Sequence, residues 1–151
     1  MLFRSELLRK IGPEPLGGEF SASYLYAKTR KRTQAIKTLL MDSRILAGVG
    51  NIYANEALFA AGILPGRKAG KLTRPECTRL VTGIKRVLKQ AIAKGGTTLR
   101  DYVNGAGEPG YFRMELNVYD RAGEPCRRCR TPIKQRRQGQ RSSYYCPGCQ
   151  K

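Results

Sequence analysis

Two pairs of cysteines near the C-terminus place the strongest constraint on how this chain can fold. Cys126 and Cys129 form a first Cys-x2-Cys pair, and sixteen residues separate it from a second pair, Cys146 and Cys149. Each pair offers two thiolates from one turn, and the segment between the pairs can bring them together as a tetrahedral Zn²⁺ site. Disulfides are the alternative, although they are uncommon in cytosolic proteins, and neither pair opens a helix of a βαβ unit as a thioredoxin-type redox motif does. The spacing predicts one structural zinc.

The residues between the two cysteine pairs predict a β-hairpin. Residues 131–136 and 141–145 are expected to form two short strands, and residues 138–140 supply the turn. A unit of this size has almost no apolar core, so metal binding should supply most of its folding free energy. Arg141 follows the predicted turn directly, where its guanidinium can reach a phosphate, although a solvated arginine is the plainer interpretation.

The charge of the chain indicates a polyanionic partner. The 151 residues include 29 Lys and Arg but only 11 Asp and Glu, a formal net charge of +18. Such an excess repels itself in a compact protein, and it is typical of proteins that bind nucleic acid. The chain contains no histidine, which excludes imidazole as a catalytic base or a zinc ligand. The longest apolar run, residues 57–64, is shorter than the roughly 18 residues that cross a bilayer, so a cytoplasmic protein is expected.

Helical signals occupy the first two thirds of the chain. One short helix is predicted from Ser21 to about residue 29, and a second after Thr33, which is expected to cap it. Asn51 is predicted to cap a third helix over residues 52–61, which ends at Gly62. The exposed amides and positive dipole end of this third helix can bind a phosphate, although many helix N-termini bind nothing.

A longer helix is predicted after Thr73. Thr73 and Glu76 form a capping box of the Thr-x-x-Glu type, and Gly95 and Gly96 end the pattern. The apolar residues of this helix recur at the spacing of one buried face: Cys77, Leu80, Val81, Ile84, Val87, Leu88, Ala91 and Ile92. Cys77 lies on this face, so it is interpreted as a core residue and not as a fifth ligand.

Several segments, in order and spacing, resemble the bacterial formamidopyrimidine-DNA glycosylases. They are GPEPL at residues 12–16, GVGNIYANEALF at residues 48–59, GGTTL at residues 95–99, PGYF at residues 109–112 and the terminal four-cysteine ribbon. The resemblance runs from about residue 11 to residue 151. It implies a mainly α fold, in which a helix–two-turn–helix domain (residues 19–112) is followed by a small β-hairpin zinc ribbon (residues 113–151). Residues 1–18 are then a remnant of an N-terminal domain and its linker.

The same resemblance implies site residues. Lys37, Asn51 and Arg141 match family residues that contact the phosphates flanking a damaged nucleotide. A glycine-rich loop matches the segment that folds over an everted 8-oxoguanine, with Gly105, Ala106, Gly107, Gly110 and Tyr111 as its members. The implied partner is double-stranded DNA that contains oxidised purines or abasic sites. The implied function is damaged-DNA binding in base-excision repair.

The catalytic half of the family pattern is absent from these residues. In the family the nucleophile is an N-terminal proline beside a glutamate, at the start of a β-sandwich domain, whereas this chain begins Met1-Leu2-Phe3. Lys37 and Lys94 are the conceivable substitutes, but no apolar run beside them predicts a depressed pKa. The chain alone is therefore expected to be an inactive monomer. A stand-alone zinc-ribbon nucleic-acid-binding protein and one half of a split glycosylase, partnered by a separate N-terminal half, are the alternative interpretations.

Overall fold

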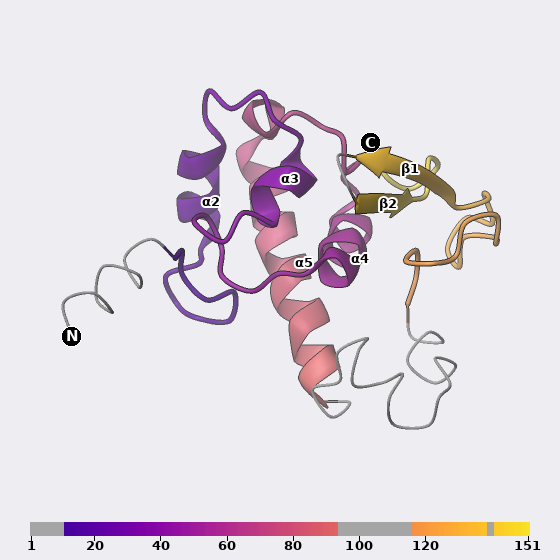
Figure 1. Ribbon diagram of the computed structural model, residues 1–151, viewed down its shortest axis with the longest axis horizontal. Helices are drawn as coiled ribbons and strands as arrows, with labels where there is room; N and C mark the ends of the chain where they lie inside the picture. The colour runs from indigo at the N-terminus through magenta and orange to yellow at the C-terminus, as the bar shows by residue number, and fades with distance from the viewer. Residues whose placement is uncertain (1–10, 94–115, 139–140) are drawn as a thin grey trace.

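A block of helices is followed by a two-stranded hairpin that packs against it (Figure 1). The computed structural model describes residues 11–93, 116–138 and 141–151. The elements are α2 (Ala22–Thr29), α3 (Ile36–Leu40), α4 (Asn51–Ala61), the 3₁₀ turn η1 (Ala69–Lys71), α5 (Arg74–Ala93), β1 (Lys134–Gln138) and β2 (Arg141–Tyr145). This arrangement confirms the predicted helical domain and small antiparallel sheet. None of the described helices is long and apolar enough to cross a membrane.

Helix α5 begins at the predicted capping box. The Glu76 backbone N–H donates to Thr73 Oγ1 at 3.3 Å, and the Thr73 N–H donates to Glu76 Oε1 at 2.9 Å. The pair satisfies two amides that the first turn would otherwise leave unpaired. Cys77, Leu80 and Ile84 are buried in the main core, as their spacing predicts. Ile92 differs from the prediction, because it is 57% exposed at the last turn of α5.

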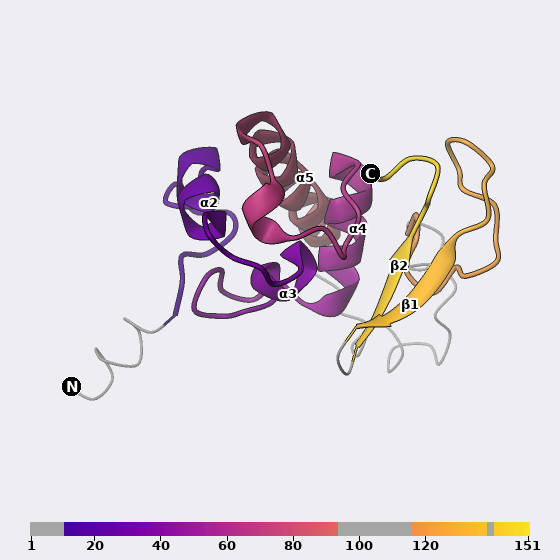
Figure 2. The same cartoon turned by 90° about the horizontal axis from the view of Figure 1, so that it is seen from above.

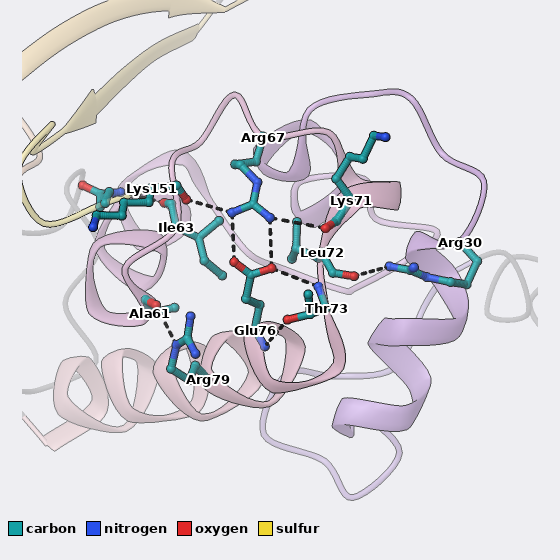
Figure 3. A network of polar contacts seen from close by, with 11 residues as sticks. Arg30, Ala61, Ile63, Arg67, Lys71, Leu72, Thr73, Glu76, Arg79 and Lys151 are labelled. Carbon is teal, nitrogen blue, oxygen red and sulfur yellow. Dashed lines mark hydrogen bonds and ion pairs between the residues drawn. The ribbon is translucent and has the colours of Figure 1, made fainter.

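The capping glutamate also anchors a wider polar network (Figure 3). The Arg67 guanidinium donates to both carboxylate oxygens of Glu76 at 2.9 Å. It also donates to the carbonyl oxygens of Lys151 at 2.8 Å and Lys71 at 3.3 Å. The hydrogen bond from Arg67 lowers the pKa of Glu76 from 4.5 to about 2. One ion pair therefore ties the C-terminal residue to the start of α5.

Close helix packing sets the centre of the helical block. A Cβ atom on Gly83 of α5 would lie 3.1 Å from the Ala57 carbonyl oxygen of α4, so glycine permits this approach. The incoming chain is fixed as well, since the Gly12 N–H donates to the Ser43 carbonyl at 2.7 Å and the Ala47 N–H to the Pro13 carbonyl at 3.0 Å.

Two predicted helix caps are wrong. Helix α3 starts after Ala35, and Thr33 does not cap it, because the backbone carbonyls of Arg67 and Pro65 accept the N–H groups of Ile36 and Lys37. Helix α4 starts after Gly50, so Asn51 is its first residue and its side chain caps nothing. Gly62 does end α4, with φ 75° in the left-handed region.

The first strand of the hairpin begins three residues later than predicted. Residues 131–133 pair with the chain before the first cysteine turn, where the Ile133 N–H donates to the Glu124 carbonyl at 2.9 Å and the Cys126 N–H to the Thr131 carbonyl at 2.9 Å. β1 and β2 then pair in antiparallel register from Lys134↔Tyr145 to Gln138↔Arg141. Arg141 is thus the first residue of β2, beside the turn.

The hydrophobic core of the zinc ribbon includes a residue of the helical block. Phe59 of α4 is buried in a cluster with Val118, Ile133, Tyr144 and the cysteine turns, and the Arg128 guanidinium covers its ring with Cζ 4.6 Å from the centroid. The chain end returns to α4 as well, where the Lys151 N–H donates to the Gly62 carbonyl at 2.9 Å. Figure 2 shows the hairpin lying along α4, on the side away from α2.

Candidate nucleic-acid interface and zinc site

The four predicted ligands meet in one cluster. The Sγ atoms of Cys126, Cys129, Cys146 and Cys149 all lie within 4.8 Å of one another. Cys126 Sγ is 3.7 Å from Cys149 Sγ, and Cys129 Sγ is 3.3 Å from Cys146 Sγ. Four thiolates about 2.3 Å from a tetrahedral Zn²⁺ are about 3.8 Å apart, so the sulfurs fit the ion.

The turns around the sulfurs are built to hold thiolates. The Arg128 N–H donates to Cys126 Sγ at 3.3 Å, and the Cys149 N–H donates to Cys146 Sγ at 3.3 Å. A Cβ on Gly148 would lie 3.1 Å from Cys129 Sγ, so glycine keeps this turn tight against the cluster. Cys77 lies apart in the helical core, where burial raises the pKa of its thiol, as expected of a structural cysteine.

The backbone carbonyl of Ser142 is the meeting point of the helical block and the hairpin. It accepts hydrogen bonds from Lys37 Nζ at 3.0 Å and Asn51 Nδ2 at 3.2 Å. Lys37 Nζ also donates to Ser143 Oγ at 2.9 Å. Two of the three predicted phosphate-binding residues therefore touch the strand that begins with the third, Arg141.

Lys37 is far more buried than the sequence predicts. The residue is 3% exposed, and burial together with the neighbouring charge of Arg141 lowers its pKa to about 8. The expectation that nothing desolvates this lysine is wrong, because the groups that cover it come from the hairpin, more than a hundred positions along the chain. The predicted lesion-loop residues Gly105, Ala106, Gly107, Gly110 and Tyr111 lie outside the described residues.

Sequence reasoning missed two further polar residues at this junction, Asn55 and Glu56. Asn55 is fully buried, and its Oδ1 accepts from the Tyr144 N–H at 2.8 Å. Glu56 is 4% exposed, and its carboxylate accepts from the N–H groups of Asn117, Val118 and Tyr119 at 2.7, 2.9 and 2.9 Å. Burial raises the pKa of Glu56, while the three donors act in the opposite direction. The available signal was two polar residues within an otherwise apolar helix.

Comparison with known proteins identifies the chain. The family described as "Formamidopyrimidine-DNA glycosylase H2TH domain" matches residues 11–103. The chain belongs to the formamidopyrimidine-DNA glycosylase family. A second family, "Zinc finger found in FPG and IleRS", matches residues 123–151 and supports the assignment of the four cysteines as one structural zinc site.

Relatives of this glycosylase-family chain are close in sequence. The formamidopyrimidine-DNA glycosylase of Thioalkalivibrio sulfidiphilus is 60% identical over 145 residues, which cover 96% of this chain and 54% of the relative. That of Cellvibrio japonicus is 58% identical over 144 residues, 95% of this chain and 53% of the relative. The chain thus spans about half the length of the relatives it matches.

Solved structures agree. The MutM (Fpg) protein of Thermus thermophilus superposes with a TM-score of 0.84 at 40% identity, covering 97% of this chain and 56% of that one. The Lactococcus lactis Fpg in complex with DNA containing an abasic site superposes with a TM-score of 0.85 at 36% identity, covering 99% of this chain and 55% of that one.

Proposed function

We propose that this chain binds damaged duplex DNA in base-excision repair, as the DNA-gripping part of a formamidopyrimidine/8-oxoguanine glycosylase. The observation that carries the proposal is the shared contact of Lys37 and Asn51 with the Ser142 carbonyl. That contact holds the N-terminal end of α4 beside the start of β2 (Figure 2). The Lactococcus lactis relative was solved with abasic-site DNA, which supports the same class of ligand here.

The three residues would divide the work of holding a strand. The Asn51 side-chain amide uses one donor on Ser142, and its second N–H, which has no acceptor among the described residues, can donate to a phosphate. Arg141 is exposed at the start of β2 and supplies a bidentate cation. Lys37 adds positive charge from its buried position against β2. Because base extrusion costs a few kcal/mol, contacts that hold the backbone on both sides of the lesion are physically required.

The test is fluorescence anisotropy with a duplex that carries a tetrahydrofuran abasic-site analogue, compared with intact duplex and with RNA of the same length. The zinc-loaded chain should favour the abasic duplex. Asn51→Ala and Arg141→Ala should each weaken binding, and Arg141→Ala should also lower the salt dependence by about one phosphate contact. Arg86→Ala is the matched control, because Arg86 is exposed on α5 and carries the same charge. Unchanged affinity in both site variants would refute the proposed interface.

The proposed function includes no catalytic attack on the damaged nucleotide by Lys37, Asn51 or Arg141. Among the lysines that the structure describes, Lys37 has a lowered pKa, yet its Nζ is buried and bonded to two oxygens of the hairpin, where it cannot reach a sugar carbon. The other candidate amine, Lys94, lies outside the described residues. Borohydride trapping of this 151-residue chain on abasic DNA should therefore give no covalent adduct. A robust adduct would overturn this part of the proposal. Equal affinity for RNA and intact duplex would instead favour a general zinc-ribbon nucleic-acid-binding protein.

A further inference from the structure

The outer edge of β2 is paired with a side chain in the way that a neighbouring strand would pair with it. Asn55 Oδ1 accepts the Tyr144 N–H at 2.8 Å, and Asn55 Nδ2 lies 3.5 Å from the Ser142 carbonyl oxygen. The C=O of one residue and the N–H of the residue two positions later are the groups that a single residue of a parallel neighbouring strand pairs with, through its own N–H and C=O. The carboxamide of Asn55 therefore takes the place of the N–H and C=O of that residue.

Asn55 is itself held rigidly. The residue is fully buried, and its Nδ2 donates to the Asn51 carbonyl oxygen at 2.8 Å, within the first turn of α4. A side chain that is tied to its own helix and bonded to a strand fixes the distance between the two. The two elements joined here are those that carry Asn51 and Arg141.

From this geometry we propose that Asn55 is a positioning residue, which sets the register of β2 against α4 and so places Arg141 beside Asn51 on a common phosphate backbone. This inference rests on the proposed function. Zinc closes the far end of the ribbon, at the cysteine turns, whereas Asn55 acts at the end that carries Arg141. Zinc stabilises the fold of the hairpin, and Asn55 sets where the start of β2 lies.

Two variants separate the contacts. Asn55→Ala removes both, and it leaves room for water to satisfy the two backbone groups, so the zinc-loaded fold should persist. Asn55→Asp keeps an acceptor for the Tyr144 N–H and loses the donors. Thr29→Val is the control, since Thr29 is an equally buried polar residue whose Oγ1 donates to the Tyr26 carbonyl, in helix α2, which lies across the helical block from the hairpin (Figure 2).

Affinity for the abasic duplex should fall about tenfold or more in Asn55→Ala at a temperature where the protein is fully folded, with a salt dependence like that of Arg141→Ala. The double variant Asn55→Ala/Arg141→Ala should bind only slightly more weakly than Arg141→Ala alone, because Asn55 acts by placing the arginine that this variant lacks. Asn55→Asp should stay closer to the parent than Asn55→Ala does. A purely stabilising residue would lower the melting temperature and leave affinity and salt dependence unchanged, as Thr29→Val should.

Several outcomes would overturn the inference. Parent-like affinity and salt dependence in folded Asn55→Ala would do so, and so would full additivity with Arg141→Ala. If Asn55→Ala does not fold, hydrogen exchange of the zinc-loaded parent decides, because the Tyr144 amide must be protected although it lies on the outer edge of β2. Failure of the parent to bind the abasic duplex would refute the proposed function instead, and protection of the Tyr144 amide would still report the register.

Discussion

Loss of the Glu56 carboxylate should loosen the ribbon from the helical block. Glu56 accepts three backbone N–H groups from residues 117–119, at the start of the ribbon, and of these the Val118 contact is fully buried. In Glu56→Ala, water can reach the two half-buried amides, while the Val118 N–H is left without an acceptor at a cost of about 1–3 kcal/mol. The one buried methylene group that is lost adds about 0.8 kcal/mol.

The expected destabilisation is therefore about 2–4 kcal/mol, a large part of the stability of a typical domain. At about 2–4 °C per kcal/mol for a chain of this size, the melting temperature should fall by roughly 5–15 °C. Glu56→Gln should cost less, because it keeps one acceptor and sets an amide group against the remaining donor. Glu14→Gln, at an exposed carboxylate, is the control for the change of charge.

Scanning calorimetry of the zinc-loaded protein at about pH 7 measures these differences, and chemical denaturation checks them. A Glu56→Ala variant within about 0.5 kcal/mol of the parent, as expected of surface changes, would show that the three amides find other acceptors and that the carboxylate is dispensable. A Glu56→Gln variant as unstable as Glu56→Ala would assign the effect to charge instead of to hydrogen bonding.

Three further predictions concern the titration of two side chains and the removal of the metal. Lys37, with a pKa of about 8, should lose its proton between about pH 7 and 9, so DNA affinity should weaken over that window in the parent and stay flat in Lys37→Met. The pKa of Glu76 is lowered from 4.5 to about 2, so its ionised carboxylate stabilises the fold above pH 4.5, and this contribution is lost as the pH falls through 2. Glu76→Gln should therefore lower the free energy of unfolding by about 1–2 kcal/mol at pH 7, measured by calorimetry. The difference between this variant and the parent should vanish in acid. Chelation should abolish amide protection in β1 and β2 and leave it in α5, and loss of all helical signal would contradict this.

Prediction from sequence succeeded where the governing chemistry is local. The spacing of Cys126, Cys129, Cys146 and Cys149 is enough to predict the zinc site, since each pair occupies one turn. The capping box at Thr73 and the stop at Gly62 depend on backbone groups three or four residues away. The resemblance to the glycosylases likewise rests on contiguous motifs, and it is confirmed.

The roles of Lys37, Asn55 and Glu56 depend on partners that lie 61 to 106 positions away along the chain. The spacing of residues in a helix does not predict such contacts, because the sequence of an apolar helix with a polar residue is the same whether that residue faces the edge of a strand or a cavity. Thr33 and Asn51 fail as caps because of distant partners as well. Carbonyls from residues 65 and 67 accept the first amides of α3, and the Asn51 side-chain amide donates to the Ser142 carbonyl. Local sequence determines the secondary-structure elements and the metal ligands. The packing of the hairpin on α4 determines which polar side chains are buried and which groups they bind.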